Sequence, residues 1–424
     1  MALIAIIGTG YVGLTTGACF AHIGHEVICV DIDEAKIAML NEGRIPIHED
    51  GLENIVREQL ATGRLRFVTD TPNAVRDREF VYLCVPTPQV PDGSADMSYI
   101  ELAAHQIAPH LTRGAVVVNK STVPVGSTRL VEHALARSDI GVVSNPEFLR
   151  EGSAVADFMN PDRVVIGAED QSAATRVASL YLGVRAPIMI TDAATAETIK
   201  YASNAFLATK LSFVNAVAAV CEVVGADVND VLLGMGYDRR IGHEFLRPGP
   251  GWGGSCFPKD TRAMIRIAED AGYDFSLLRG VIAVNDEQFE RVTEKVARCA
   301  GGSLEGVRVG ALGLTFKAGT DDLRASPALE ILSRLVQRGA LVRAYDPAVH
   351  EAPIPGIEVV DDAYATCDGA AVLVVLTEWD EFKWLDYDKI AATMAKRCVV
   401  DARNILDKGA LLRRGFSYMG VGRN

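Results

Sequence analysis

The sequence predicts an α/β protein in which two open parallel-sheet domains flank an all-helical part. Three observations support this fold class. Short apolar runs alternate with helical patterns over residues 1–195. Residues 193–224 then contain neither proline nor glycine, and the alternation resumes at residue 306. A chain of 424 residues is long enough for two or three such domains.

The strands expected in the N-terminal domain are short, rich in valine and isoleucine, and bounded by turn or helix-start residues. Continuous apolar strands of this kind are typical of a parallel sheet that helices cover on both faces. The runs are LIAIIG, EVICVD, FVYLCV, AVVVNK, IGVVSN, RVVIGA and PIMIT.

The middle of the chain is expected to be helical. Residues 193–224 carry apolar positions at roughly helical spacing, and further helical patterns cover 258–271 and 275–300. Strands return with GVRVGALGL, LVRAYD, AAVLVVL and RCVVDAR, and the segment 299–306 is expected to be a linker. The predicted domains therefore span residues 1–195, 196–300 and 301–424.

Composition excludes several classes of protein. The formal net charge of −13 argues against a nucleic-acid partner, which needs a basic footprint. The N-terminus lacks a secretory pattern, and we expect no membrane span, because Lys210, Asn215 and Glu222 interrupt the most apolar helix.

The eight cysteines form no CxxC pair and no zinc spacing, so we expect no metal site. Five of them, in apolar segments, are expected to be buried reduced thiols, which favours the cytoplasm. They are Cys19, Cys29, Cys84, Cys221 and Cys398.

The first strand runs into a glycine motif that opens a helix: Gly8, Thr9, Gly10, Tyr11, Val12 and Gly13. Gly8 permits a tight turn, Gly10 lets the backbone approach a pyrophosphate, and Gly13 allows close helix–strand packing. The helix N-terminus supplies N–H donors and partial positive charge to phosphates. This pattern predicts a Rossmann-like dinucleotide site; Gly93 and Gly114, which lack this context, are expected to be ordinary turn residues.

Asp31 ends the second strand about twenty residues after the motif. A carboxylate there accepts the ribose hydroxyls and repels a 2′-phosphate. We therefore expect NAD rather than NADP, although Lys36 and Arg44 lie nearby in the sequence and weaken this preference.

The stretch GPGWGGSCFPKD places Cys256 just before a helix that starts near Pro258. The helix dipole and Lys259 both favour the thiolate, the nucleophilic form. A cysteine in a purely structural turn is the alternative interpretation. A nucleophilic thiol adds to an aldehyde, and hydride loss from the adduct leaves a thioester that water converts to an acid. Together with NAD, Cys256 therefore indicates oxidation to a carboxylate.

Four other residues are candidates to assist the thiol. Lys200 and Asn204 share one helix face and can donate to an oxyanion. Thr122 and Glu147 each follow a predicted strand, where open α/β sheets bind ligands, and can position and activate water. An exposed polar helix face and ordinary loop residues are the alternatives.

Several cations can bind a second nucleotide. Lys317, Arg324 and Arg403 follow strands of the last domain and suit phosphate groups. Arg239, Arg240 and Arg247 precede the thiol stretch.

The order of these motifs resembles the nucleotide-sugar dehydrogenase family, that is, the UDP-glucose/GDP-mannose dehydrogenases. The resemblance covers nearly the whole chain and is most specific in the thiol stretch. Its motifs are GTGYVG, VDID, STVPVGST, NPEFLREGSA, KYASNAF, RIGHEFLRPGPGWGGSCFPKD, FKAGTDDLR and DARN.

The resemblance implies two Rossmann-like domains, a central helical dimerisation domain with a long connecting helix, and a homodimer whose further assembly stays open. It implies that two NAD oxidise C6 of UDP-glucose to UDP-glucuronate through a Cys256 thioester. Lys200 and Asn204 would hold the oxyanion, Asp260 and Thr122 the water, and Glu147 would assist hydrolysis. The implied cofactor contacts are Gly8, Gly10, Tyr11, Val12, Gly13, Asp31, Lys36, Thr87, Thr122, Glu151, Lys259 and Arg324. The implied substrate contacts are Glu147, Phe148, Leu149, Lys200, Asn204, Phe245, Leu246, Arg247, Gly253, Cys256, Phe316, Lys317 and Arg403, with Arg240 reaching the partner's site.

Alternatives remain open at this point. The same chemistry on dTDP-glucose or, more remotely, GDP-mannose fits the motifs. A one-step hydroxyacid-type dehydrogenase and a non-enzymatic nucleotide-sugar sensor are further hypotheses. Trp252 and Ala325 depart from the residues that many relatives carry, which puts the contacts at those two positions in doubt.

Overall fold

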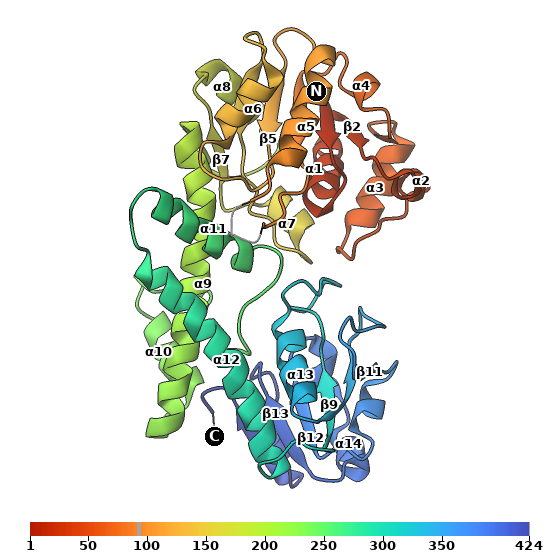
Figure 1. Cartoon of the computed structure of the whole chain (residues 1–424). Coiled ribbons are helices and arrows are strands. Elements are labelled where there is room, and N and C mark those ends of the chain that lie inside the picture. Colours follow the sequence, from red (N-terminus) through yellow and green to blue (C-terminus); the bar gives the residue numbers. More distant parts are fainter. Residues whose placement is uncertain (91–94, 424) are drawn as a thin grey trace. The chain divides into compact units, whose positions relative to one another are not determined.

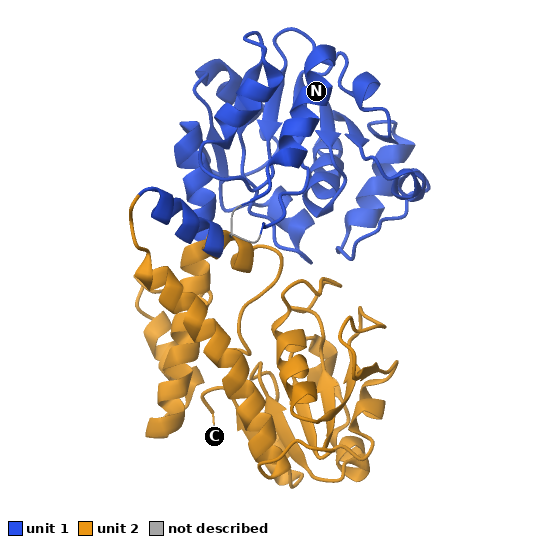
Figure 2. Ribbon diagram, viewed as in Figure 1, with its two compact units in different colours: residues 1–203, 262–271 blue, residues 204–261, 272–424 orange. Residues whose placement is uncertain are grey.

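The computed structural model describes residues 1–90 and 95–423, so the predicted turn glycine Gly93 lies outside the described residues. Two compact units, coloured separately in Figure 2, make up the chain. The first comprises residues 1–203 and 262–271, and the second 204–261 and 272–424. The division falls inside two helices, α9 (Ala193–Val224) and α11 (Phe257–Asp270).

The first unit is built on an eight-stranded sheet in the order β3-β2-β1-β4-β5-β6-β7-β8. Strands β1 to β6 are parallel, in the order typical of dinucleotide-binding domains; β7 pairs antiparallel with β6, and β8 follows β7 in parallel. The bounds are β1 Leu3–Ile7, β2 Glu26–Val30, β3 Leu65–Val68, β4 Phe80–Leu83, β5 Val116–Asn119, β6 Gly141–Ser144, β7 Val164–Gly167 and β8 Ile188–Thr191.

Helices cover both faces of this sheet (Figure 1), which explains why its central strands are apolar throughout. The helices are α1 Tyr11–His22, α2 Glu34–Asn41, α3 Leu52–Ala61, α4 Thr71–Ala74, α5 Ser98–Ile107, η1 Ala108–His110, α6 Ser127–Leu135, α7 Ala154–Met159 and α8 Gln171–Ser179.

The second unit contains a six-stranded parallel sheet in the order β11-β10-β9-β12-β13-β14. Its strands are β9 Arg308–Leu312, β10 Leu341–Tyr345, β11 Ile357–Val359, β12 Val372–Val375, β13 Cys398–Asp401 and β14 Ser417–Gly420. Its helices after β9 are α13 Pro327–Gln337, η2 Ala363–Cys367, η3 Asp380–Trp384, α14 Tyr387–Thr393 and α15 Lys408–Arg413. The predicted fold class, two Rossmann-like parallel-sheet domains with a long helix between them, is confirmed.

The middle of the chain is helical, as expected, and includes α9, α10 (Val228–Gly236), α11 and α12 (Ser276–Ala300). Among the described residues, α9 is the one helix long and apolar enough to span a membrane by length and composition. One third of its most apolar window is buried (33%), and helices of soluble proteins also meet this criterion.

The second unit has a hydrophobic core that the central helices and the C-terminal sheet share. Val214 of α9, Val292 of α12 and Val374 of β12 belong to one buried cluster. Leu304, inside the predicted linker, is buried in the same cluster, so the segment 299–306 is packed rather than exposed throughout. The division at residues 195 and 300 stays a prediction.

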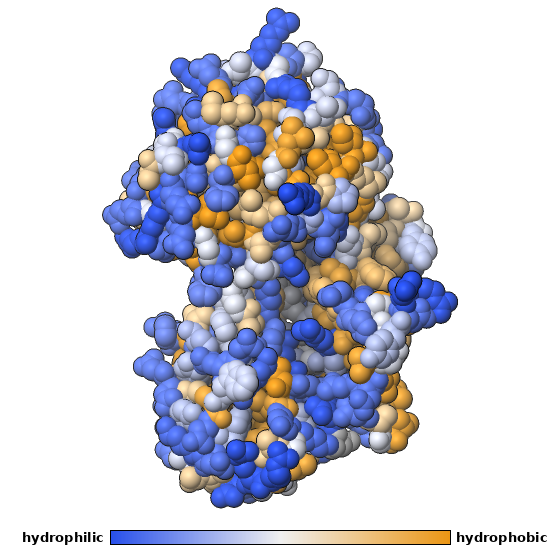
Figure 3. All heavy atoms as spheres, turned by 180° about the vertical axis from the view of Figure 1, so that it is seen from behind, coloured by the Kyte–Doolittle hydropathy of each residue, from blue (hydrophilic) through white to orange (hydrophobic). Residues whose placement is uncertain are grey.

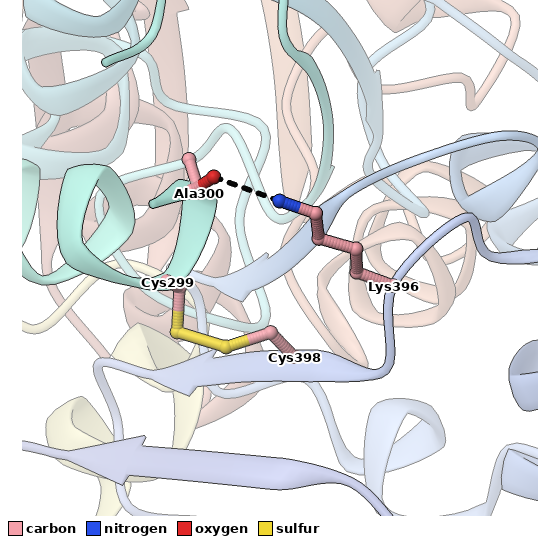
Figure 4. The surroundings of a disulfide bond; sticks show 4 residues. All are labelled: Cys299, Ala300, Lys396 and Cys398. Carbon is pink, nitrogen blue, oxygen red and sulfur yellow. Dashed lines mark hydrogen bonds between the residues drawn. A yellow bond between two sulfur atoms is a disulfide. The ribbon is translucent and has the colours of Figure 1, made fainter. Parts of the chain in front are cut away.

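Cys398 is not a reduced thiol, which corrects the sequence-based expectation. It forms a disulfide with Cys299, joining the start of β13 to the end of α12 (Figure 4). The two cysteines are 99 residues apart in sequence but their Cα atoms are 6.0 Å apart, a separation that pattern reading does not reveal. Because disulfides are uncommon in reducing compartments, the cysteines favour the cytoplasm less than the sequence suggested.

Candidate active site

The glycine motif after β1 has the geometry that its three glycines predict. Gly8 has a φ of 97°, and a Cβ there would lie 2.6 Å from the Cys84 carbonyl oxygen. A Cβ at Gly13 would lie 2.0 Å from the Gly8 oxygen, so α1 packs directly on the turn. A Cβ at Gly10 would meet nothing within 4 Å, which leaves its backbone open to a ligand. The helix that follows begins at Tyr11, so its first N–H groups lie beside the open position.

Asp31 follows β2 and is held by Thr9 of the glycine motif and by Lys36 of α2. Its carboxylate accepts hydrogen bonds from the Thr9 N–H at 3.0 Å and the Thr9 hydroxyl at 2.6 Å. Lys36 donates to it at 2.9 Å. Burial alone raises the pKa of Asp31, but these hydrogen bonds outweigh it and lower the pKa to about 2. Asp31 is therefore a permanent anion at the end of the strand.

Sequence reasoning did not identify Glu49, which joins Tyr11 to the turn before α7. The Tyr11 hydroxyl donates to the buried Glu49 carboxylate. The Gly152 N–H lies 2.8 Å from the Tyr11 oxygen and 2.7 Å from Glu49 Oε2. Glu49 thereby links the glycine motif to the loop that carries Phe148, Leu149 and Glu151. The signal was weak in sequence because its partners lie 38 and 103 residues away.

Thr87 and Thr122, predicted cofactor contacts after β4 and β5, are hydrogen-bonded to each other. The Thr87 hydroxyl donates to the Thr122 carbonyl oxygen at 2.9 Å. Both residues are half-buried at the carboxyl ends of neighbouring strands, where this class of sheet binds ligands.

Glu147, after β6, forms a buried ion pair with Lys200 of α9. The Lys200 ammonium donates to Glu147 Oε1 at 3.0 Å, and both side chains are about 5% exposed or less. The same ammonium lies over the ring of Phe148, and the Arg163 guanidinium also lies over this ring, 3.8 Å from its centroid. A buried pair of this kind holds both charged groups in fixed positions.

Cys256 precedes the first residue of α11, as the sequence predicts. The Asp260 N–H donates to the Cys256 carbonyl oxygen at 2.8 Å, which makes Cys256 the cap residue and puts Pro258 at the second helical position. The thiol is half-buried, and Ser255 Oγ lies 3.6 Å from its sulfur. The helix N-terminus is therefore directly beside the sulfur-bearing residue.

Asp260 is completely buried and joins two other predicted residues. It accepts hydrogen bonds from Asn204 Nδ2 at 2.6 Å and from the Lys259 ammonium at 2.7 Å. The positive charge of Lys259 is thus paired with Asp260, so its support for the thiolate is weaker than the sequence suggested. Asn204, which α9 carries, binds the same carboxylate and so lies beside Asp260 as well.

Buried polar residues that sequence reasoning missed hold the backbone of the thiol stretch. Asn215 accepts from the Gly249 N–H at 2.9 Å, and Gln288 donates to the Gly249 carbonyl at 2.7 Å. Asn285 pairs with both backbone groups of Trp252, at 2.8 and 3.0 Å. The Trp252 indole N–H donates to Ser212 at 2.9 Å. The sequence does carry one indication of these residues, because they are polar residues within apolar helical patterns. Those of α9 and those of α12 bind the same loop.

The glycines of this stretch allow the protein to pack against itself. A Cβ at Gly253 would lie 1.9 Å from the Ala325 carbonyl oxygen, and one at Gly254 2.8 Å from the Phe316 ring. Gly254 also has a φ of 82°, and Ala325 itself has a φ of 46°. A side chain is therefore excluded at Gly253 by the neighbouring backbone, whether or not a sugar lies there.

Arg403, Phe316 and Lys317 come together at the carboxyl ends of β9 and β13. Arg403 donates to the Leu376 and Phe316 carbonyl oxygens, both at 2.8 Å. The Lys317 ammonium lies over the Phe316 ring, 5.6 Å from its centroid. This arrangement places two cationic side chains and an aromatic ring at the edge where open sheets bind nucleotides, and Arg403 is also paired with Glu378, 3.1 Å away.

The other predicted arginines lie on the surface and are not brought into this group. Arg240 and Arg324 are exposed, with bidentate hydrogen bonds to Asp238 and Asp322. Arg239 and Arg247 are also exposed. Phe245 and Leu246 are half-buried, and Phe245 has a φ of 61°, which few side chains adopt.

Comparison with known families covers all three predicted parts. Residues 2–184 match the NAD binding domain, residues 194–287 the central domain and residues 310–408 the UDP binding domain of one family. The chain belongs to the UDP-glucose/GDP-mannose dehydrogenase family. It is therefore an NAD-dependent dehydrogenase with a nucleotide-sugar substrate, and the expected cofactor is confirmed.

Relatives of this family cover almost the whole chain. A UDP-glucose 6-dehydrogenase of Rhizobium meliloti is 46% identical, covering 99% of each chain. A solved UDP-glucose dehydrogenase from Pyrobaculum islandicum matches with a TM-score of 0.93 at 39% identity, covering 100% of this chain and 98% of that one. A UDP-D-ManNAc dehydrogenase from Pyrococcus horikoshii matches with a TM-score of 0.89 at 29% identity, covering 99% of each. The fold is thus common to enzymes named for different sugars.

Proposed function

We propose that this family member oxidises C6 of UDP-glucose to the carboxylate, with the stoichiometry UDP-glucose + 2 NAD + H2O to UDP-glucuronate + 2 NADH. The relatives named as UDP-glucose dehydrogenases support the glucose substrate. The observation that carries the reaction class is Cys256 at the start of α11, followed in the first helical turn by the buried Asp260. A simple alcohol oxidation has no use for such a thiol.

NAD, when bound, accepts one hydride in each of the two oxidations. The residues after β1 and β2 fit this cofactor, because the backbone at Gly10 is open and Asp31 is an anion that repels a 2′-phosphate. The contacts proposed for NAD are Gly8, Gly10, Tyr11, Val12, Gly13, Asp31, Lys36, Thr87, Thr122, Glu151, Lys259 and Arg324.

Cys256 supplies the covalent step. Its sulfur forms a bond to the C6 aldehyde carbon, and the carbonyl π electrons become an alkoxide that Lys200 and Asn204 stabilise by donating hydrogen bonds. Loss of a hydride from this adduct gives a thioester. Water adds to the thioester, Glu147 assists this addition, and the carbon–sulfur bond breaks to return the thiolate and release the acid.

Asp260 and Thr122 are proposed to hold the water through which protons leave the substrate hydroxyl. Asp260 suits this role because its carboxylate is fixed by Asn204 and Lys259. The sugar nucleotide is proposed to contact Glu147, Phe148, Leu149, Phe245, Leu246, Arg247, Gly253, Phe316, Lys317 and Arg403.

The test is NADH release with UDP-glucose, dTDP-glucose, GDP-mannose and a UDP-N-acetylhexosamine, measured together with acid product. Two NADH per UDP-glucose, and the highest kcat/KM with this substrate, support the proposal. Cys256→Ser should abolish acid release while the fold is kept, with Cys221→Ser as a buried-cysteine control. One NADH per turnover and an unchanged rate in Cys256→Ser would identify a one-step dehydrogenase. A higher kcat/KM with dTDP-glucose would mean that the substrate carries thymine rather than uracil.

We propose a homodimer formed through the central helices. Phe206, Phe213 and Val220 are exposed by 64%, 54% and 60% on α9 at seven-residue spacing, and so form one apolar stripe. In Figure 3, apolar atoms also lie along the edge formed by α9 and α10, among hydrophilic ones. The exposed Arg240 would then reach the partner's site. Phe213→Asp should shift the light-scattering mass from dimer to monomer, and an unchanged mass would contradict this interface.

We propose a cytoplasmic location. Burial of the apolar stripe in a dimer would account for the exposed apolar residues of α9 without a membrane. This helix also carries four charged residues, Glu197, Lys200, Lys210 and Glu222. Fractionation of cells that express the full chain tests the location, and recovery with membranes after a high-salt wash would contradict it.

A further inference from the structure

Glu197, on the second turn of α9, is a buried carboxylate to which the proposed reaction assigns no role. It is 1% exposed. It accepts three hydrogen bonds, and all three come from the N-terminus of α6: from the Gly126 N–H at 2.6 Å, the Thr128 N–H at 3.0 Å and the Thr128 hydroxyl at 2.8 Å. The cap residue of α6 is Gly126, which has no side chain to satisfy these first N–H groups. Glu197 therefore caps α6 from a distant helix.

The capped turn is the far end of the segment that carries Thr122. At its near end, the Ser121 hydroxyl donates to the Val85 carbonyl at 2.7 Å, and Thr87 donates to the Thr122 carbonyl at 2.9 Å. At its far end, Gly126 has a φ of 97° and its N–H points to Glu197. Residues 121–126 are thus held by hydrogen bonds at both ends, and the Glu197 carboxylate is the partner at the second end.

The same helix holds the neighbouring loop by the same means. Lys200 lies three residues after Glu197, on the same helix face, and binds Glu147 after β6. One stretch of α9 therefore fixes the segments after β5 and β6 with two buried charges of opposite sign. Burial raises the pKa of Glu197, and the hydrogen bonds from Gly126 and Thr128 only partly oppose this rise. Desolvating a carboxylate here costs free energy that these bonds must offset.

We propose that Glu197 is a positioning residue that holds residues 121–126 so that Thr122 is set for the cofactor. The proposal rests on the proposed function, in which Thr122 contacts NAD. It predicts that loss of the Gly126 hydrogen bond weakens NAD binding through Thr122, and leaves binding of the sugar nucleotide largely unchanged.

Glu197→Gln is the informative variant. A glutamine keeps one oxygen for Thr128 but presents its NH2 group, a donor, to the Gly126 N–H. The matched control is Glu222→Gln, which removes a carboxylate of the same helix that accepts from the Lys295 ammonium and the Gly422 N–H, at 2.6 and 2.8 Å. Thr128→Val, which removes one donor to Glu197 and keeps the side-chain shape, serves if Glu197→Gln does not fold.

The affinity for NAD is measured directly by titration without sugar nucleotide, and KM for each substrate is measured separately. Glu197→Gln is expected to raise the Kd of NAD about tenfold, equivalent to one charge-assisted hydrogen bond, with KM for the sugar nucleotide within about twofold. Thr128→Val is expected to act in the same direction by about threefold. Glu222→Gln is expected to lower the melting temperature and leave NAD affinity unchanged.

A double-mutant cycle tests whether Glu197 acts through Thr122. On a Thr122→Ala background, Glu197→Gln should cost little further NAD affinity. An equal cost on both backgrounds, or a lower melting temperature with unchanged NAD affinity, would overturn the proposal and leave Glu197 as a structural cap. If the unmodified protein binds NAD but does not oxidise UDP-glucose, the proposed function fails while the binding test of Glu197 still decides its role.

Discussion

Strands β1 to β6 of the first sheet and the six strands of the second share one parallel strand order, but the turn that follows the first central strand differs between the two sheets. In both, a glycine with positive φ ends that strand: Gly8 with 97° and Gly313 with 101°. Both glycine N–H groups donate at 2.8 Å to the last residue of the neighbouring strand, Val30 or Tyr345. After this common start, the first turn opens α1 at once, whereas the second continues as a loop up to α13.

An aspartate follows the neighbouring strand in both sheets, and its surroundings differ. Asp31 keeps some exposure, 12% of its side chain, and is bound by Thr9 and Lys36. Asp346 is buried and accepts from the Leu314 N–H at 2.7 Å, from the N–H and hydroxyl of Thr315 and from the Trp379 indole. The aspartate of the first sheet is therefore partly exposed and is proposed to contact NAD, whereas that of the second is buried against the protein's own loop.

The difference teaches how one topology serves two nucleotides. In the first sheet, an open glycine backbone and a helix N-terminus are available to the pyrophosphate. In the second, Thr315 stands where the first sheet has its open glycine, so side-chain cations, Lys317 and Arg403, are proposed to take the phosphates instead. Fold alone does not distinguish these roles; the turn residues do.

The largest expected effect is that of Asp346→Ala. Removing this carboxylate leaves buried donors of Leu314, Thr315 and Trp379 without an acceptor, so we expect the melting temperature to fall by roughly 5–10 °C. Sugar-nucleotide binding should fall with it, because the released loop carries Phe316 and Lys317. Calorimetry and substrate titration check this, with Asp386→Asn, an exposed cap of α14, as the control. Normal stability would show that Asp346 is not the anchor of the loop.

Gly10→Ala is expected to have the next largest effect, which should fall on NAD binding and not on stability. The new Cβ meets nothing in the protein within 4 Å, so the melting temperature should stay the same. NAD binding should weaken by about tenfold or more, because the methyl group occupies space proposed for the pyrophosphate. Gly234→Ala, at another open glycine, is the control, and Gly13→Ala should instead destabilise the turn itself. Unchanged NAD affinity in Gly10→Ala would place the cofactor elsewhere.

The sequence predicted the parts of the fold that depend on continuous burial. The central strands of both sheets are apolar over their full length, and the long helix α9 has neither proline nor glycine; both were expected where they occur. The strands β3, β11 and β14 were missed, because strands at sheet edges are short and partly exposed and so carry a weaker pattern. Helix α10 was missed as well.

The candidate site was predicted where residues lie close in sequence and was incomplete where they do not. The glycine motif and Cys256 stand in local contexts that carry their own physical meaning. The polar residues that hold them, among them Glu49, Glu197 and Asn285, bind partners tens of residues away. Such pairings depend on how elements pack, and no spacing in the sequence encodes them. The Cys299–Cys398 disulfide was missed for the same reason.

A smaller effect is expected at Asp31, where the comparison can be sharpened by pH. Its folded pKa of about 2 lies below its ordinary value of 3.8, so ionised Asp31 stabilises the fold above about pH 4. This contribution, about 2 kcal/mol, should disappear as the pH falls from about 4 to 2. Melting curves of Asp31→Asn and the unmodified chain should therefore differ at neutral pH and converge in acid. Because Asp31 stays ionised above pH 5, the loss of NAD affinity caused by Asp31→Asn should be the same at pH 5 and pH 8, and a loss that shrinks at pH 5 would contradict this assignment.

The smallest effects are expected at the cysteines, which are reduced thiols in the first unit and include a disulfide in the second. Cys19, Cys29 and Cys84 of the first unit are buried; burial raises the pKa of Cys19 and Cys84 to about 12, and these thiols should not react in the native state.

Cys398→Ser removes the disulfide of the second unit. The segments that it joins are also held by their shared core and by the Lys396 ammonium, which donates to the Ala300 carbonyl at 3.0 Å (Figure 4). We therefore expect a loss below the roughly 2–4 kcal/mol typical of a disulfide, seen as a melting temperature lower by a few degrees. NAD affinity, which belongs to the first unit, should not change, and a reductant should reproduce the variant in the unmodified chain. A reductant that alters NAD binding but not melting would show that the disulfide acts on the first unit rather than on the packing of the second.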